Sequence, residues 1–284
     1  MIRRLLLGAA FAAATLSAFA PAALVPSALA QAPACAPRVP DSELVKPRTL
    51  TLSTNPTLPP MQYVNAQGQL VGMRVDLGSE IARRLCLSVE HVRVEFAAMI
   101  PGLAARRWDM INTGMFYTEE RAKLMYLVRY EEQAISISVP RGNPRKITKF
   151  EDLTGLTVGV EQGGFEFRRT QDIAKALEEK GLKPITIRPF DNFAVSFQAL
   201  RVGQLDAAVS IDSTGKEYDE RGDFTRALSG LFGTPINFGL RSKVLAQAVE
   251  VVLGVMKADG SFGALLDKYG VKPYDGPFDV VGPG

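Results

Sequence analysis

The sequence predicts an α/β fold built from parallel sheets with helices on both faces. Segments with strand-like and helix-like patterns alternate through most of the chain, which is typical of such sheets. About 250 residues follow the N-terminal leader, which exceeds one average domain and suffices for a full core without staples. Two extended runs without helical period, 132–140 and 235–240, interrupt the alternation. In such sheets we expect ligands beyond the carboxyl ends of the strands.

The first 30 residues have the pattern of a secretory signal peptide. Arg3 and Arg4 precede an apolar run, Leu5–Ala20, and Ala28-Leu29-Ala30 supplies the small-x-small cleavage pattern. The residues before Cys35 form a poor lipobox, so we expect residues 1–30 to be removed and a soluble product to be exported to the periplasm. No other window is apolar for long enough to span a bilayer, which argues against an integral membrane protein.

Charge and cysteine content narrow the function classes further. The leader takes two arginines from the 33 basic residues, leaving 31 against 30 acidic ones, so the charge gives no support for nucleic-acid binding. Cys35 and Cys86 are the only cysteines, and an oxidising compartment favours a disulfide between them. Such a bond closes a loop of about 51 residues and contributes about 4 kcal/mol in the chain-entropy model. Two free cysteines or a catalytic thiol are the alternative, although His91, the single histidine, gives Cys86 no obvious base.

The mature chain opens with strand patterns. Leu50–Thr54 alternates as a strand and ends at a proline-rich loop, 55–60, which cannot continue a sheet. Met61–Leu70 has the pattern of a hairpin with its turn at 66–68. The next helix is expected to place three residues on one apolar face: Leu77, Ile81 and Leu85.

Three short elements are expected next. The alternation of Val92, Val94 and Phe96 predicts a strand that ends at Phe96. Met99-Ile100-Pro101 opens a short helix with Leu103 and Trp108 as apolar anchors. A brief strand, Asp109–Asn112, then leads into a turn at Thr113-Gly114.

The second half repeats the alternation. A strand from Leu156 to Glu161 runs into Gly163-Gly164 and a helix, so backbone amides point at the open end of the sheet. A tight turn is the alternative for that glycine pair. Further strands are expected at 185–188 and near 203–209, followed by Asp212, and further helices at 192–202 (opened by Asp191), after Ser242, and at 262–269.

The clearest candidate site lies at the start of the helix that follows Thr113-Gly114. Thr118 is placed as its N-cap, and Glu119 and Glu120 fill the first turn. Arg121 returns one turn later towards residues 113–116. Backbone amides, a hydroxyl and a guanidinium that converge in this way can bind a carboxylate. The alternative is that Arg121 is a solvated helix charge.

This region resembles the family 3 solute-binding proteins of bacterial ABC transporters, the polar amino-acid receptors. The residues that match the family pattern are Phe96, Met99, Ile100, Pro101, Leu103, Asp109, Thr113, Gly114, Met115, Thr118, Glu120 and Arg121. The resemblance extends over residues 50–270. It implies a two-lobed type II periplasmic binding fold, with two mixed sheets flanked by helices and joined by a two-strand hinge. Lobe 1 is then 31–136 and 236–284, and lobe 2 is 137–235.

The resemblance also implies a function. A receptor of this family captures a small carboxylate-bearing solute, such as an amino acid or a derivative, by closing its lobes, and a membrane permease then reads the closed form. We expect a monomer with no cofactor, no metal site, no catalytic residues and no nucleic-acid partner. The ligand-binding positions carried over are Asn55, Leu58, Phe96, Thr113, Gly114, Phe116, Arg121, Gly163, Gly164, Phe165 and Asp212.

The resemblance also implies a partner for the ligand ammonium. In the family it meets an Asp five residues after the Asp of the G-x-x-D-A segment; counting from Asp206 gives Ile211, and Asp212 is one further. Either a bulge brings Asp212 into the site or the ammonium has a different partner. Glu161 and Glu166 could meet a cationic side chain, but we expect them to be solvated carboxylates.

Several other positions depart from the family pattern, and most lose a polar group. The departures are Asn55 for Asp, Leu58 for Tyr, Phe116 for Ser, Gly164-Phe165 for a Thr pair, and Arg74 for an Asp. A direct copy of a histidine or lysine site is therefore not expected.

Two other function classes remain open. A few proteins on this scaffold are enzymes, such as cyclohexadienyl dehydratases, and their chemistry needs a positioned acid or base. His91 is badly placed for that role, and the sequence has no Ser-His-Asp or metal-ligand cluster. The other class is a sensory module that passes its ligand to a membrane receptor.

Overall fold

The computed structural model describes residues 39–283. One mixed sheet of nine strands runs through this part of the chain in the order β5-β1-β6-β11-β7-β10-β8-β9, with β12 paired to β7, and a small sheet holds β2-β3-β4. The strands are β1 (Thr49–Thr54), β2 (Thr57–Leu58), β3 (Gln62–Val64), β4 (Leu70–Val71), β5 (Ser88–Arg93), β6 (Met110–Phe116), β7 (Tyr126–Pro140), β8 (Thr157–Glu161), β9 (Thr186–Phe190), β10 (Ala207–Ile211), β11 (Phe224–Leu240) and β12 (Val280–Val281).

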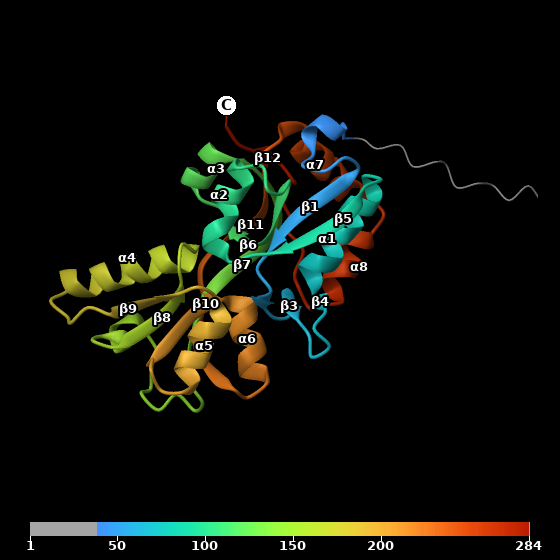
Figure 1. The fold of residues 1–284 in the computed structure, drawn as a ribbon. Helices are drawn as coiled ribbons and strands as arrows, with labels where there is room; N and C mark the ends of the chain where they lie inside the picture. The colour runs from blue at the N-terminus through green and yellow to red at the C-terminus, as the bar shows by residue number, and fades with distance from the viewer. Residues whose placement is uncertain (1–38, 284) are drawn as a thin grey trace, which may run out of the picture. The chain divides into compact units, whose positions relative to one another are not determined.

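Helices cover the sheet in two separate groups (Figure 1). Lobe 1 holds α1 (Met73–Arg84), α2 (Phe96–Ala104), α3 (Glu119–Leu124), α7 (Lys243–Ala258) and α8 (Ser261–Asp267). Lobe 2 holds α4 (Phe165–Glu179), α5 (Phe193–Arg201) and α6 (Asp212–Glu220). Two 3-10 turns, Asp41–Glu43 and Phe150–Leu153, complete the elements. The predicted α/β class and its two-lobed form are confirmed.

The sheets of the two lobes are continuous because two long strands run through both. β7 and β11 pair antiparallel from Phe224↔Pro140 to Leu240↔Tyr126. On the lobe 1 side β11 pairs with β6, and on the lobe 2 side β7 pairs with β10. The expected hinge is therefore a two-stranded ribbon, and the lobe boundaries expected at 136/137 and 235/236 fall inside β7 and β11.

Within each lobe the strands of the large sheet that lie beside the ribbon pair parallel with one another, as the alternation predicts. β1 pairs parallel with β5 and β6, and β8 pairs parallel with β9 and β10. Their apolar side chains form a core from residues such as Leu50, Leu52, Val158 and Val209, which are essentially inaccessible to solvent. The carboxyl ends of β1, β6, β8 and β10 all lead towards the junction between the lobes.

The expectation that Phe96 ends a strand is wrong. β5 stops at Arg93, level with the last residue of its parallel partner β1, Thr54. Without a partner strand the chain turns into α2, which begins at Phe96 and contains Pro101. Trp108 packs against Gly102, where a Cβ would lie 2.1 Å from its ring.

The expected turn at Thr113-Gly114 is also wrong. These residues continue β6, because β11 runs beside them and pairs with Met115 and Phe116. β1 pairs with β6 only at Met110 and Ile111. The later part of β6 thus leaves the β1 edge and reaches the junction between the lobes.

The start of α5 differs from the prediction by one residue. Asn192, not Asp191, is the N-cap, and its side chain accepts a hydrogen bond from the Val195 amide at 3.0 Å. Its Nδ2 donates to Glu95 Oε1 at 3.1 Å, so the cap also connects lobe 2 with the residue before α2.

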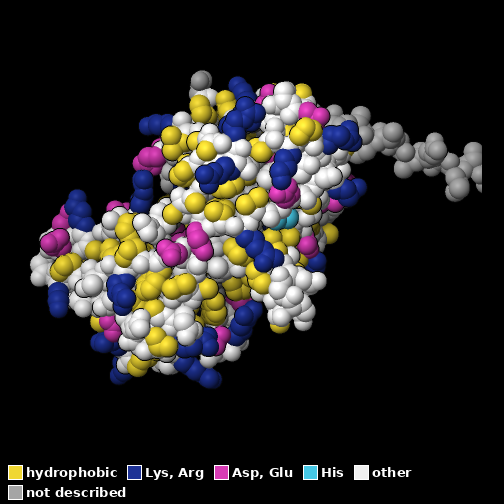
Figure 2. Space-filling view, in the orientation of Figure 1, with side chains coloured by type: hydrophobic (Ala, Val, Ile, Leu, Met, Phe, Trp, Pro, Cys, Tyr) yellow, Lys and Arg dark blue, Asp and Glu magenta, His cyan; other side chains and the backbone are white. Residues whose placement is uncertain are grey.

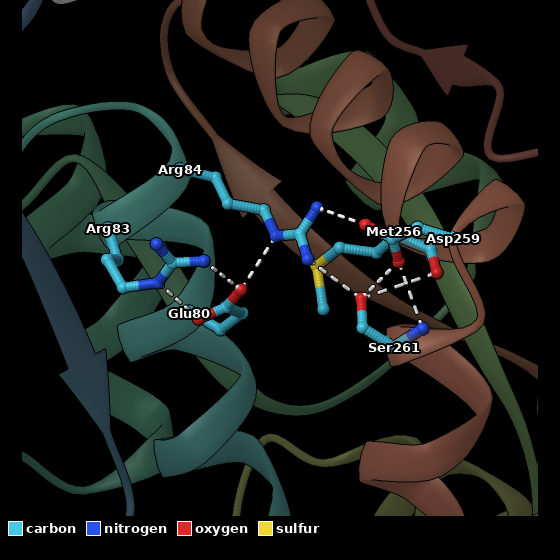
Figure 3. A network of polar contacts seen from close by, with 6 residues as sticks. All are labelled: Glu80, Arg83, Arg84, Met256, Asp259 and Ser261. Atoms are coloured by element: carbon cyan, nitrogen blue, oxygen red, sulfur yellow. Dashed lines mark hydrogen bonds and ion pairs between the residues drawn. The ribbon is translucent and has the colours of Figure 1, made fainter. Parts of the chain in front are cut away.

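A polar network joins α1 to the turn between α7 and α8 (Figure 3). Glu80 accepts hydrogen bonds from Arg83 and Arg84, and Arg84 reaches Asp259 Oδ2 at 2.8 Å and Ser261 Oγ at 2.9 Å. The hydrogen bonds from Arg83 and Arg84 lower the pKa of Glu80 to about 2. The network fixes the C-terminal helices of lobe 1 against α1.

Two sequence predictions fall outside residues 39–283. The signal peptide lies there, and so does Cys35, so the disulfide between Cys35 and Cys86 remains a prediction. Between residues 39 and 283, no helix combines the length and the apolar character needed to cross a membrane.

Candidate functional site

Arg121 is buried at the junction between the lobes. Thr118 caps α3 and accepts a hydrogen bond from the Arg121 amide at 3.2 Å, as expected. The Arg121 side chain is 7% exposed, donates from Nη1 to the Phe116 carbonyl oxygen at 2.7 Å, and lies 5.1 Å from the Phe96 ring centroid. Burial lowers its pKa to about 10, so the guanidinium remains charged at neutral pH. The alternative of a solvated helix charge is therefore wrong.

Two carboxyl groups of lobe 2 lie close to this guanidinium. Glu161 ends β8 and Glu166 lies in the first turn of α4; they are 2% and 3% exposed. Burial is the main cause that raises the pKa of Glu166 to about 7 and that of Glu161 well above its ordinary value, and Arg121 partly opposes both shifts. The expectation that both are solvated carboxylates is wrong.

Asn55 of lobe 1 holds Glu161 directly. Its Nδ2 donates to Glu161 Oε1 at 2.7 Å, and its Oδ1 accepts from Thr57 Oγ1 at 2.8 Å. Asn55 itself is fully buried at the end of β1. An amide at this position can donate to a carboxylate across the junction, which an Asp could not do while ionised.

Aromatic rings close the same junction. Phe116 at the end of β6 stacks on Phe165 at the start of α4, with ring centroids 4.6 Å apart. Arg169 also lies over the Phe165 ring, 5.2 Å from its centroid. Gly164 leaves room for Glu166, since a Cβ there would lie 2.5 Å from Glu166 Oε2. On the face of the molecule drawn in Figure 2, acidic side chains lie among hydrophobic ones across the middle of the view.

Gly114 allows a close approach of the two lobes. A Cβ there would lie 2.2 Å from Ile211 Cδ1 of lobe 2, 3.5 Å from Arg74 Nη1 and 3.6 Å from Leu58 Cδ2. Thr113, next to it, accepts a hydrogen bond on Oγ1 from Gln62 Nε2 at 2.7 Å. Leu58, Thr113 and Gly114 therefore form the lobe 1 wall that faces Ile211.

No role for Arg74 is predicted from the sequence, but the structure places it directly behind this wall. It is fully buried and donates to Tyr130 OH at 2.7 Å, to Gln62 Oε1 at 2.8 Å and to Glu131 Oε2 at 2.8 Å. Glu131 is equally buried and belongs to β7. Burial and the neighbouring Glu131 raise the pKa of Tyr130 further, while Arg74 opposes that rise. The presence of Arg74 in place of an Asp was visible in the sequence and pointed to a special position. Its buried partner on β7, Glu131, could not be recognised from the sequence.

Asp212 is separate from the Arg121 cluster. It is the first residue of α6 and pairs with Arg226 at 3.0 Å. β10 stays in regular register through Ile211, so no bulge turns Asp212 towards Gly114. Asp212 instead lines a cavity of about 460 Å³ together with ribbon residues Glu132, Gln133, Ala134, Gly233, Thr234, Pro235 and with Lys272.

Gly163 lies at the mouth of the same junction, where its Cβ position would be 3.9 Å from Ala97 of α2. Of the eleven positions carried over from the sequence, the structure thus collects ten along the facing edges of the lobes and pairs the eleventh, Asp212, with Arg226. Among residues 39–283, no group of three or more His, Cys, Asp or Glu side chains is arranged to hold a metal ion.

A comparison with known protein families finds a match over most of the chain. The family model for bacterial extracellular solute-binding proteins, family 3, matches residues 50–272. The chain belongs to this family. Among family 3 relatives, the histidine-binding periplasmic protein of Escherichia coli K12 is 29% identical over 250 residues, covering 83% of this chain and 90% of the relative. The lysine/arginine/ornithine-binding periplasmic protein of the same strain is 28% identical, covering 78% and 88%.

Solved structures of amino-acid-binding proteins share the fold of this family 3 chain. An ancestral arginine-binding protein bound to glutamine is 30% identical, with a TM-score of 0.70, and covers 79% of this chain and 98% of its own. The ancestral amino acid-binding protein AncCDT-1, a precursor of cyclohexadienyl dehydratase, is 27% identical, with a TM-score of 0.68, and covers 78% and 95%.

Proposed function

We propose that this protein is the periplasmic substrate-binding component of an ABC importer. It captures a small solute with a carboxylate group, an amino acid or a derivative, and presents the closed form to a membrane permease. The observation that carries the proposal is Arg121, a guanidinium buried at the junction of the lobes, whose hydrogen bond within residues 39–283 goes to the Phe116 carbonyl oxygen. Its planar donors suit a carboxylate.

Closure follows from contacts that each lobe supplies in part. Lobe 1 contributes Arg121, Asn55 and Phe116, and lobe 2 contributes Phe165 and the amide-rich segment at Gly163-Gly164. A ligand that contacts both sets binds the closed form more tightly than the open form, and so shifts the population towards closure. Small-angle scattering should then show compaction when the ligand saturates the protein.

The experiment that tests this function is a ligand screen followed by substitution of Arg121. Thermal shifts against amino acids, opines and carboxylates identify the ligand, since a ligand at a hundred times its Kd adds about 2.7 kcal/mol of stability. Arg121→Gln should then weaken binding at least about 30-fold, because a buried charged pair is worth about 2 kcal/mol or more. Lys123→Gln, exposed on the same helix, is the matched control. Unchanged affinity in Arg121→Gln contradicts the proposal.

One observation favours a second candidate, a dehydratase of the cyclohexadienyl type. A buried carboxyl that keeps its proton near neutral pH, as Glu166 does, can act as a general acid beside a guanidinium that holds a substrate carboxylate. Incubation with prephenate or arogenate should give an ultraviolet-absorbing product if this candidate is right, and Glu166→Gln should abolish it. We propose the binding role first and expect no turnover.

A further inference from the structure

The charges buried at the lobe junction do not balance. Arg121 supplies one positive charge, and Glu161 and Glu166 can supply two negative charges, all on side chains that are at most 7% exposed. A ligand carboxylate on Arg121 adds a third negative charge. Uncompensated buried charge costs several kcal/mol per ion, so the closed, liganded form needs a further positive charge or protons.

Within residues 39–283, the structure offers little to compensate the two glutamates. Arg121 is the only cation that acts on the charge of Glu166, and the hydrogen bond shown for that carboxyl comes from its own backbone amide. Glu161 accepts from the neutral Asn55 amide and lies near Glu95 as well as Glu166, which disfavour its charge. Arg168, which also acts on the charge of Arg121, is exposed and pairs with Glu120 at 3.4 Å.

In the family pattern an aspartate binds the ligand ammonium. This chain has no acidic residue at the corresponding position on β10. Ile211 occupies that position and packs its Cδ1 against Gly114. The next residue, Asp212, pairs through Oδ2 with Arg226 and lines the separate cavity at the ribbon. The two buried glutamates of lobe 2 are the carboxyl groups that lie beside Arg121.

We propose that Glu161 and Glu166 form the subsite for the cationic part of the ligand, and that the ligand carries a net positive charge in addition to its carboxylate. This rests on the proposed function, in which Arg121 holds the carboxylate. A ligand with one carboxylate and two cationic groups brings the three buried groups and the ligand to zero net charge with both glutamates ionised. A ligand without net charge would leave one of the two glutamates holding a proton instead.

Pairs of amino acids that match in length and differ in charge test the proposal by calorimetry at pH 7. The pairs are L-arginine and L-citrulline, L-lysine and L-norleucine, and L-2,4-diaminobutyrate and L-homoserine. In the pair that binds, the cationic member should bind at least tenfold more tightly than the neutral one. Glu161→Gln and Glu166→Gln should each reduce that ratio at least tenfold, and Glu178→Gln, exposed on α4, should leave it unchanged.

A second readout is the proton release that accompanies binding. Ionisation of the glutamates by a cationic ligand releases protons, so the binding enthalpy of the wild-type protein should depend on the ionisation enthalpy of the buffer. The Gln variants should lose part of this dependence, and thermal unfolding verifies that they are folded. A buffer-independent enthalpy for a cationic ligand contradicts the proposal.

The outcomes separate this inference from the proposed function. If the neutral members bind equally well, or if the preference survives both Gln variants, the cation subsite is wrong while the carboxylate receptor stands. The same holds if only anionic solutes such as L-glutamate or L-malate bind and Arg121→Gln abolishes that binding. If no carboxylate solute binds at all, both proposals are wrong.

Discussion

At the scale of single residues, the arginine at position 74, where the family pattern has an aspartate, places a positive charge in the interior of lobe 1. Arg74 and Glu131 form a fully buried ion pair that Tyr130 and Gln62 complete by hydrogen bonds. A buried pair of this kind contributes little net stability compared with apolar residues, but removal of one partner leaves the other charge uncompensated. The folded protein therefore tolerates Arg74 and Glu131 together but not either one alone.

Substitution of Arg74 alone should destabilise the protein strongly. We expect Arg74→Met to lower the free energy of unfolding by about 3–5 kcal/mol, because Glu131 is left buried without its cation. The double variant Arg74→Met/Glu131→Met should recover most of that loss. Lys46→Met, which removes an exposed pair with Glu90, should change it by less than about 1 kcal/mol. Denaturant unfolding measures all three, and a loss below 1 kcal/mol for Arg74→Met contradicts this account.

Gly114 is the residue at which a single carbon should interfere with closure. A Cβ in Gly114→Ala would meet Ile211 Cδ1 at 2.2 Å, too close for the lobes to approach as they do here. We expect ligand affinity to fall at least tenfold, and the double variant Gly114→Ala/Ile211→Ala to regain most of it because the clashing atom is removed. Gly254→Ala, which meets nothing within 4 Å, is the control. Calorimetry with the screened ligand decides, and full affinity in Gly114→Ala would show that the lobes do not approach at this point.

At the scale of elements, the ends of helices and strands depend on different kinds of information. α3 with its Thr118 cap was predictable from sequence, because a capping hydroxyl and its amide partner lie three residues apart. The start of α2 and the extension of β6 were not. They depend on where β1 stops and where β11 runs, and β11 lies more than 100 residues further along the chain.

The same distinction explains the site. Arg121, Gly114 and Phe116 lie in one continuous segment whose spacing points to a carboxylate site. The burial of Glu161 depends on an amide 106 residues away, that of Asn55, so no local pattern announces it. Asp212 is the opposite case: its neighbourhood in sequence suggests the site, while the structure pairs it with Arg226 of β11.

The cap of α5 gives a direct test of a one-residue difference between sequence and structure. Asn192→Ala should cost about 1 kcal/mol of stability, since the Val195 amide loses its acceptor. Asp191→Ala, next to it and exposed, should cost less than about 0.5 kcal/mol. Denaturant midpoints of the two variants distinguish them, and equal losses would contradict the assignment of Asn192 as the cap.

At the scale of the whole molecule, closure of the lobes and proton binding are coupled through Glu166. Its folded-state pKa of about 7 lies above the ordinary value of 4.5, with burial as the main cause. Arg121 and its own amide face it, and Glu161 lies close by on β8. The closed protein therefore holds more protons than the unfolded chain, or than an open form in which the carboxyl is solvated, between these two values.

The sign of the pH dependence follows from this difference. The stability of the unliganded protein should fall as the pH rises from about 4.5 to about 7, because the unfolded chain loses its proton first. Glu166→Gln should flatten the profile in this window. Thermal unfolding at half-unit steps from pH 5 to pH 8 measures both, with Glu178→Gln as the control. A wild-type profile that rises across the window contradicts the assignment.

The two strands of the ribbon that joins the lobes use different numbers of residues to cover the same span. From Arg226 to Thr234 β11 advances eight residues, while its partners on β7 run from Ser138 to Gln133, only five residues, and the register shifts at several points between them. β11 therefore has three more residues than β7 over this part of the ribbon. When the lobes move apart, these extra residues can change conformation while the hydrogen bonds between β7 and β11 on either side are kept. We therefore expect the bending of the hinge to occur at residues 226–234.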